Sequence, residues 1–339
     1  MAESPKEEKR KLLPATKKMT LEEYKAKYSK PENAKAARFF LTLFASAIGV
    51  VIFTCLTLIV LRIFEIHEIA GYVSIGIAVL IFILCYVVPL VKINRLPVFQ
   101  TRVNYQNARL AKAHNRKVRE KLADSIISLA SETDNLGWYD ENRVGRLAVA
   151  RQTNKNEDLK QVLSEIFDID IRKQARSMIT KTALKVAGWS ALSQDDKLDT
   201  TIVGLYELNM VKEIFYLYGF RPSDAKMAKI FGSILSHALI AYGASASTTT
   251  IVHGVTESIG PKLGILGGII STVVGSASQG LVNGIITVVI GMKAKHYLNM
   301  EYHLQDVLDG VVLDEEDEDE VLEEVKSGIG QAIKQNKKK

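Results

Sequence analysis

The chain has 339 residues, a formal net charge of +6 and 47% hydrophobic residues. This length accommodates two domain-sized units, and a mean hydropathy of +0.07 is typical of a protein that is part membrane and part water-soluble, not of a multi-pass transporter. Both cysteines lie in apolar segments, and the six histidines form no paired metal-binding spacing. We therefore expect no catalytic, cofactor-binding or metal-binding residues, and a protein that is not an enzyme.

Residues 1–38 form a charged arm, with no apolar segment close to Met1 of the kind that a secretory signal peptide requires. Thr20 and Glu23 have the spacing of a capping box, which predicts a short helix that ends at Tyr28. This helix could dock on the rest of the protein or belong to a solvated tail with transient helicity. We expect the solvated tail, because the arm has too little apolar patterning to fold alone.

Two apolar segments follow, Phe39–Leu61 and Ile69–Val91, each uncharged over 23 residues. As helices they would each extend roughly 35 Å, enough to cross a hydrocarbon core of about 30 Å. Helices of a soluble core seldom stay uncharged on every face over this length. The pattern predicts a transmembrane hairpin with its turn at Arg62–Glu68.

Basic residues return directly after the second segment, with nine Lys or Arg and a single acid in residues 92–121. The positive-inside rule therefore places the N-terminus and the bulk of the chain in the cytoplasm. Lys92–Lys121 is expected to attract anionic lipid, at about 1 kcal/mol for each basic residue near the surface. Nucleic-acid binding is not expected, because Tyr105 is the only aromatic residue within the helical part of this stretch.

Helical periodicity dominates the next part of the chain. Asn156 is a suitable N-cap, and apolar residues recur at helical intervals from Leu159 to Val186. Leu198–Tyr218 is apolar on most of its circumference, so it must be buried or lie against the membrane, and Gly219 suits the position after its end. No strand pattern longer than a few residues is present, and the predicted fold is all-α.

Glycine and small residues characterise the C-terminal block. Residues 230–252 are moderately apolar, and residues 263–292 are uncharged and glycine-rich, with close-packing motifs at Gly264–Gly268 and Gly280–Gly284. Two interpretations stay open. The segments form either a second membrane hairpin or a tightly packed helical domain beside the membrane.

The polar residues in these helices carry no recognisable catalytic pattern. Glu207, Lys212 and Glu213 share one helix, where their spacing favours surface salt bridges. His237 and Asn283 could line a polar path, but we expect them to be satisfied buried residues. The acidic run 314–320 lacks the spaced ligands of a calcium loop and is interpreted as a solvated linker.

The fold prediction is thus all-α, with a transmembrane hairpin, a cytoplasmic helical region and a glycine-rich helical C-terminal domain whose embedding in the membrane is left open. The predicted boundaries are 1–38 for the arm, 39–91 for the hairpin, 92–198 for the basic and helical region, 199–298 for the C-terminal domain and 299–339 for the tail.

Three stretches carry a resemblance to a known family: LNMVKEIFYLYGFRP (208–222), KIFGSILSHALIAYGAS (229–245) and SQGLVNGIITVVIGMKAKHYL (278–298). Together with the order of the segments, they resemble the YcjF-like bacterial membrane proteins, a GTPase-associated family of unknown function. The resemblance implies a location in the bacterial inner membrane and a membrane partner or regulator of a GTPase. It provides no catalytic residue.

The function predicted from these observations is a membrane-anchored adaptor that docks a cytoplasmic partner. A P-loop GTPase in trans is the expected partner, since the chain has no G-x-x-x-x-G-K-[ST] motif of its own. Self-association into a homo-oligomer is a further expectation. The alternative is a pore-forming or membrane-perturbing protein that uses residues 230–292.

An even number of crossings keeps the Lys-rich C-terminus on the same side as the N-terminus. We therefore expect Gln331→Cys to resist an impermeant maleimide added outside intact cells and to react after permeabilisation. Labelling in intact cells would show an odd number of crossings.

Overall fold

The structure, a computed structural model, describes residues 19–28, 33–104, 106–131, 138–153, 155–192, 196–243 and 279–313. The chain divides into two compact units. Unit 1 comprises Met1–Pro31, Phe99–Lys117 and Tyr302–Lys339, and unit 2 comprises Glu32–Val98 and Val118–Glu301.

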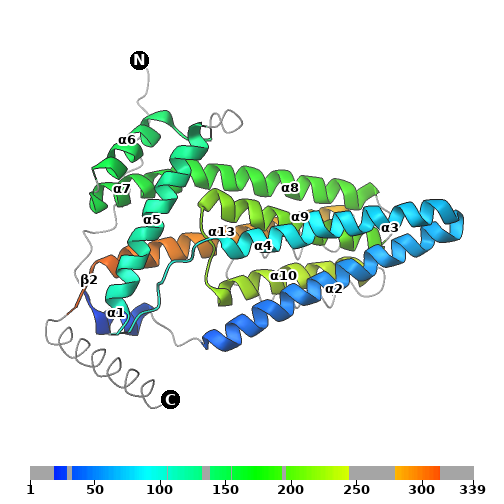
Figure 1. Ribbon diagram of the computed structural model, residues 1–339, viewed down its shortest axis with the longest axis horizontal. Coiled ribbons are helices and arrows are strands. Elements are labelled where there is room, and N and C mark those ends of the chain that lie inside the picture. Colours follow the sequence, from blue (N-terminus) through cyan, green and yellow to red (C-terminus); the bar gives the residue numbers. More distant parts are fainter. Residues whose placement is uncertain are drawn as a thin grey trace, which may run out of the picture. The chain divides into compact units, whose positions relative to one another are not determined.

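Helices account for nearly all of the described structure, as the sequence predicts (Figure 1). The first helices in the chain are α1 (Leu21–Tyr28), α2 (Ala34–Ile66), α3 (Glu68–Phe82), the π-helix η1 (Ile83–Val87) and α4 (Val88–Arg95). They are followed by α5 (Ala108–Ser131), α6 (Glu141–Gln152), α7 (Asn156–Ile166), the π-helix η3 (Phe167–Ile171), α8 (Arg172–Leu192), α9 (Asp196–Tyr218), α10 (Asp224–Gly243) and α13 (Gln279–Asp309). Two short strands, β1 (Met19–Thr20) and β2 (Val311–Val312), complete the set.

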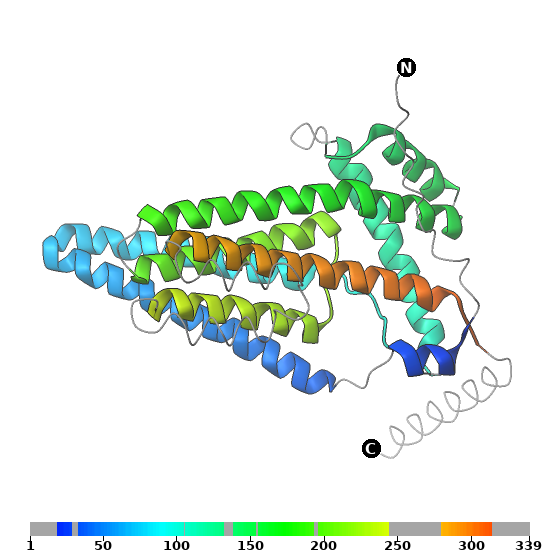
Figure 2. The same ribbon diagram turned by 180° about the vertical axis from the view of Figure 1, so that it is seen from behind.

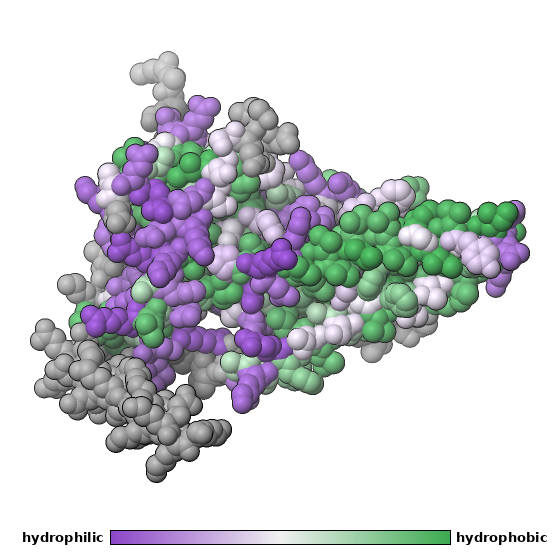
Figure 3. Space-filling view, viewed as in Figure 1, coloured by the Kyte–Doolittle hydropathy of each residue, from purple (hydrophilic) through white to green (hydrophobic). Residues whose placement is uncertain are grey.

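The predicted hairpin is α2 followed by α3, η1 and α4. Two helical stretches of this hairpin, Ala34–Ile66 and Glu68–Arg95, are long and apolar enough to cross a membrane. Many of their apolar side chains are exposed, and Figure 3 shows most of this surface in green, with paler residues between. A soluble protein rarely exposes so large an apolar area, so the surface indicates contact with lipid.

The turn of the hairpin is shorter than predicted. α2 continues through Ile66, and His67 alone separates it from α3. His67 adopts an extended conformation with φ −160°, and its backbone N–H closes α2 on Ile63. Asn33 caps the other end of α2 by accepting hydrogen bonds from the backbone N–H groups of Lys35 and Ala36. Residues up to Ile66, which were predicted to lie in the turn because of their charges, are therefore part of helix α2.

Helix α10 runs beside α2 in the same direction (Figures 1 and 2). Asp224, the first residue of α10, lies 3.4 Å from Arg38 near the start of α2. Farther along both helices, the backbone of Gly232 approaches the ring of Phe44 so closely that a Cβ would lie 3.4 Å from it. The two contacts follow one another in the same order on both helices. α10 therefore lies at the level of the apolar run of α2.

Helix α9 packs against both of these helices. Gly204 on α9 lies against Ile52 of α2, where a Cβ would be 3.4 Å away, and against Ala238 of α10. Ile52 is fully buried, and so are Val203 and Leu208 on α9. The expectation that this apolar helix is buried is confirmed.

Helices α13 and α8 pack through small residues. A Cβ on Gly284 would lie 2.9 Å from the Cβ of Ala187 and 3.1 Å from the carbonyl of Ala183. Gly280, one turn earlier, meets the backbone of Ala187 in the same way. The motif Gly280–Gly284 thus brings two helix backbones together, as its sequence predicts. Gly264–Gly268 lies outside the described residues.

Unit 1 contains the short helix of the N-terminal arm. Leu21 and Tyr24 of α1 are 2% and 0% exposed, and the Tyr24 hydroxyl donates a hydrogen bond to the carbonyl of Thr101 at 2.7 Å. β1 pairs in parallel with β2, joining Met19 to Val311. The expected solvated tail is therefore wrong for residues 19–28. The partners of α1 come from distant parts of the chain, which local apolar patterning cannot reveal.

The capping box at the start of α1 is present as predicted. The Thr20 N–H donates to the Glu23 carboxylate at 3.1 Å, and the Glu23 N–H donates to the Thr20 hydroxyl at 3.3 Å. These reciprocal bonds satisfy two backbone donors at the helix start.

We expect Gly284→Ala to destabilise the protein by about 1–3 kcal/mol, because the added methyl group overpacks the contact with α8. Gly188→Ala is the matched control. Gly188 lies on α8 with no atom within 4 Å of a built Cβ, so alanine there should stabilise by about 0.5–1 kcal/mol through helix propensity. Thermal unfolding of the full-length protein in detergent measures both. Equal effects of the two substitutions would contradict the close approach.

Candidate functional site

A cluster of polar side chains lies inside unit 2, where four helices meet. Glu207 comes from α9, His237 from α10, Asn283 and Thr287 from α13, and Ser190 from α8. Each is at most 3% exposed. We refer to these five residues as the polar cluster.

Hydrogen bonds connect the members of the polar cluster. His237 Nδ1 lies 2.6 Å from Glu207 Oε1, and His237 Nε2 lies 3.2 Å from Asn283 Oδ1. The Asn283 amide donates to the Ser190 hydroxyl at 2.9 Å. The Thr287 hydroxyl lies 2.9 Å from Glu207 Oε1 and the same distance from the Asn283 carbonyl. The network therefore joins all four helices.

The hydrogen-bond pattern fixes how many protons the Glu207–His237 pair holds. With this amide orientation Asn283 Oδ1 is only an acceptor, so His237 Nε2 must carry a proton. The 2.6 Å contact on the other side of the ring then needs one more proton, either on His237 Nδ1 or on Glu207 Oε1. Both arrangements are neutral overall. The two buried side chains are thus joined by one short hydrogen bond.

One atom of the polar cluster has no partner among the described residues, the second carboxylate oxygen of Glu207, Oε2. A buried carboxylate oxygen without a hydrogen bond is costly, because it has lost its contact with water and gained no partner. The orphaned oxygen marks Glu207 as the least satisfied member of the cluster.

The polar cluster lies beside the middle of the apolar run of α2. Gly204, one turn before Glu207, contacts Ile52, which is near the centre of Phe39–Leu61. Ionisable residues buried in such apolar surroundings are costly unless they are paired. Among the described residues no group of three or more His, Cys, Asp or Glu side chains is arranged to hold a metal ion.

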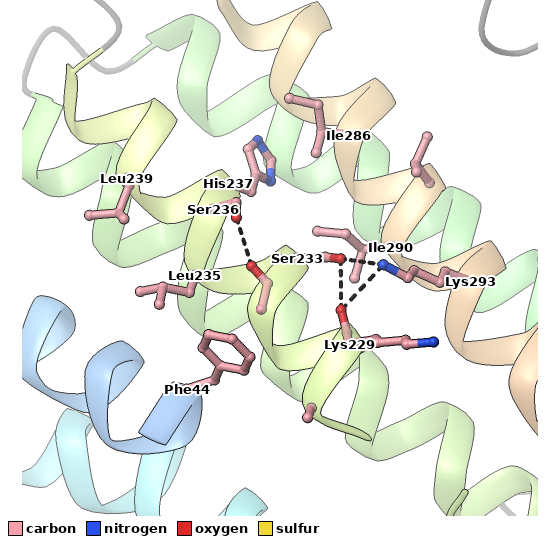
Figure 4. Close-up of a pocket in the computed structure, with 13 residues that line it drawn as sticks. Phe44, Lys229, Ser233, Leu235, Ser236, His237, Leu239, Ile286, Ile290 and Lys293 are labelled. Carbon is pink, nitrogen blue, oxygen red and sulfur yellow. Dashed lines mark hydrogen bonds between the residues drawn. The ribbon is translucent and has the colours of Figure 1, made fainter. Parts of the chain in front are cut away.

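A groove of about 410 Å³ lies between α10 and α13, next to the polar cluster (Figure 4). Phe44 of α2 contributes to its wall, and His237 borders it. Leu235, Leu239 and Ile286 supply apolar surface. We call this the α10–α13 groove.

Basic residues gather at one end of this groove. Lys293 Nζ donates to the Lys229 carbonyl at 3.2 Å and to the Ser233 hydroxyl at 2.7 Å (Figure 4). Lys229 is exposed, and its ammonium group has no acidic partner in the part of the chain that the structure describes.

A second basic group lies where α13 meets the start of α8. Burial lowers the pKa of Lys295, and the nearby charges of Arg176 and Arg172 lower it further. Lys295 is only 6% exposed, so its charge is poorly solvated.

The structure confirms some residue predictions and corrects others. His237 and Asn283 are satisfied and buried, as expected. Glu207 was expected in surface salt bridges, and this is wrong, since its side chain is fully buried against His237. Helical spacing on α9 alone cannot show which face α10 and α13 cover. The contributions of Ser190 and Thr287 were not foreseen.

The basic stretch Lys92–Lys121 does not present all its charges to the outside. Arg119 is 1% exposed and donates to the Asn156 side chain at 3.1 Å. Asn156 was predicted to be the N-cap of this helix. It is instead the first residue of α7, and Lys155, one residue earlier, occupies the N-cap position.

Comparison with known proteins agrees with the proposed resemblance. Residues 154–311 match the model of a domain of unknown function, DUF697. A UPF0283 membrane protein of Bradyrhizobium diazoefficiens is 27% identical over 111 residues, which are 31% of this chain and 32% of that protein. A UPF0283 membrane protein of Rhodopseudomonas palustris is 26% identical over 114 residues, 32% of this chain and 31% of that protein.

The similarity to the YcjF-like family is thereby confirmed for the C-terminal part of the chain. The chain spans about a third of the length of the curated relatives it matches. No solved structure matches it. The protein is a membrane protein with two candidate spans and bacterial homologues.

We expect Glu207→Leu to destabilise the protein by about 3–5 kcal/mol, because His237 and Thr287 lose their buried partner. Glu213→Leu on the same helix is the control, with an expected loss of about 1 kcal/mol, since Glu213 only accepts a hydrogen bond from Asn209 at 2.9 Å. The double variant Glu207→Leu/His237→Leu should be more stable than the sum of the single changes predicts. Unfolding in detergent is measured for the wild type, Glu207→Leu, His237→Leu, the double variant and Glu213→Leu, and strict additivity would argue against a coupled pair.

Proposed function

We propose that this protein is a membrane-anchored adaptor or regulator, without catalytic activity of its own, that docks a cytoplasmic P-loop GTPase. The candidate spans supply the anchor. The basic residues that flank the hairpin support an inner-membrane location with the N-terminus and the bulk of the chain in the cytoplasm.

The observation that carries the proposal is an exposed helix face on a rigid support. On α6 the exposed residues follow helical spacing and form what we call the α6 face: Asn142, Gly145, Arg146, Val149 and Gln152. Val149 is 60% exposed, and a Cβ on Gly145 would meet no atom within 4 Å. The α6 face is therefore open and has an apolar centre, which suits a protein contact.

Ion pairs hold α6 in place. Arg143 binds Asp170 of η3 through two hydrogen bonds of 2.9 and 2.6 Å, the bidentate geometry that fixes a guanidinium most firmly. Arg146 pairs with Glu165 of α7. The Asp140 side chain caps α6 by accepting from the Arg143 N–H at 3.0 Å. A preorganised surface loses little conformational entropy when a partner binds.

The class of partner rests on resemblance. YcjF-like proteins are often encoded beside a GTPase, and the matched residues 154–311 include α7 and η3, which support the α6 face. A GTPase has to come from a separate chain or a separate region, since residues 1–339 contain no phosphate-binding loop motif.

The pore alternative requires polar side chains that line a path through residues 230–292. In the described portions of this segment, His237 and Asn283 are bound to neighbouring side chains and are 1% and 2% exposed. This arrangement favours an adaptor over a pore.

The test is affinity purification of the full-length protein in mild detergent, followed by mass spectrometry. We expect a P-loop GTPase to be retained by the wild-type protein. The variant Gly145→Glu/Val149→Glu should retain about tenfold less GTPase, because two charges replace the open and apolar centre of the α6 face. Both changes are at exposed helical positions, so the fold should be preserved.

Leu110→Glu is the matched control, since Leu110 is 69% exposed on α5 and should not affect retention. The proposal fails if the wild-type protein retains no GTPase. The assignment of the α6 face fails if the Gly145→Glu/Val149→Glu variant retains as much GTPase as the wild type.

A further inference from the structure

We propose that the α10–α13 groove binds an anionic glycerophospholipid, with its head group at Lys229 and Lys293 and an acyl chain along the apolar wall. The proposal rests on the membrane anchorage described above and not on the identity of a protein partner.

The position of the groove relative to α2 is the first step. Phe44 of α2 is part of the groove, and it lies six residues beyond Arg38, where the apolar run of α2 has begun. Asp224 at the start of α10 lies near Arg38. If α2 crosses the membrane, the groove therefore opens within the leaflet at the Arg38 end of α2.

The polarity of the groove changes along its length. Lys229 and Ser233 lie in the first half of α10, near the Arg38 end, and Lys293 approaches them from α13. Leu235 and Leu239 follow on α10, and Ile286 adds apolar surface from α13 (Figure 4). A phospholipid in this leaflet has the same order, a charged head group at the interface and acyl chains toward the membrane centre.

The charges of the groove select the head group. Lys229 has no acidic partner among the residues that the structure describes, while Lys293 is held by the Lys229 carbonyl and Ser233. Lys226, a buried lysine of α10, is neutralised by Glu301 at 2.8 Å, so it does not compete for an anion. Lys229 and Lys293 thus offer two positive charges to a head group whose phosphate has no compensating cation.

The groove wall beyond the lysines is suited to an acyl chain. Ser236 and His237 are polar residues that border this part. The Ser236 hydroxyl donates to the Gly232 carbonyl at 2.8 Å, and both ring nitrogens of His237 are engaged by Glu207 and Asn283. Its ring therefore demands no hydrogen bond from a ligand. Leu239 is 49% exposed, and a bound acyl chain would bury this apolar side chain, which favours binding.

Native mass spectrometry of the full-length protein in mild detergent tests the proposal. The protein is titrated with phosphatidylglycerol and with phosphatidylcholine of the same acyl composition. We expect phosphatidylglycerol to bind at least about tenfold more tightly, and Lys229→Gln/Lys293→Gln to reduce that preference by about tenfold. Leu239→Trp, which narrows the apolar part of the groove, should weaken the binding of phosphatidylglycerol while the basic end is kept.

The control variant is Lys181→Gln/Lys185→Gln, which removes two exposed lysines of α8 that do not line the groove. It should bind phosphatidylglycerol as the wild type does. Equal binding of the two lipids by the wild type, or an unchanged preference after Lys229→Gln/Lys293→Gln, would overturn the proposal.

A chemical probe identifies a competing occupant. Ser236→Cys, at the groove, should react with a maleimide in lipid-free detergent and be protected by phosphatidylglycerol. Protection without lipid would show that another part of the protein fills the groove and would refute lipid binding. The Gly145→Glu/Val149→Glu variant should bind lipid normally, so a failure of the adaptor proposal is distinguished from a failure of this one.

Discussion

The architecture of unit 2 depends on the close packing of α9 and α10 along α2. Gly204 and Gly232 allow the helices to approach Ile52 and Phe44 with no intervening side chain. Because these contacts occur along the apolar run of α2, any membrane insertion of α2 determines the environment of the neighbouring helices. The hairpin is therefore part of the bundle and not a separate tether.

This packing explains why a buried ionisable pair can exist in such apolar surroundings. Glu207 and His237 would each be costly to bury alone, but each provides the other with a hydrogen-bond partner. Asn283, Thr287 and Ser190 satisfy most of the remaining hydrogen-bonding groups, and they come from two further helices. The polar cluster thereby specifies how four helices align.

The two proposals assign different tasks to different parts of unit 2. The α6 face lies on a helix that is held in place by ion pairs such as Arg143–Asp170, as is usual for a surface in water. The α10–α13 groove is apolar except for its basic end. A protein with both features can present a rigid docking surface while lipid contacts hold its helical bundle at the membrane. This division is consistent with similarity to bacterial membrane proteins over residues of the C-terminal domain.

The sequence alone determined the hairpin, the all-helical fold, the capping box of α1 and the close packing at Gly280–Gly284. Each depends on local spacing or on apolar length, which a linear sequence records. Tertiary structure decided that α1 docks, that Glu207 is buried and that α10 runs beside α2. These outcomes depend on contacts between residues far apart in the chain, such as Tyr24 with Thr101 and Glu207 with His237. A helical pattern shows that a residue shares a face with its neighbours, but only the packed fold shows what covers that face.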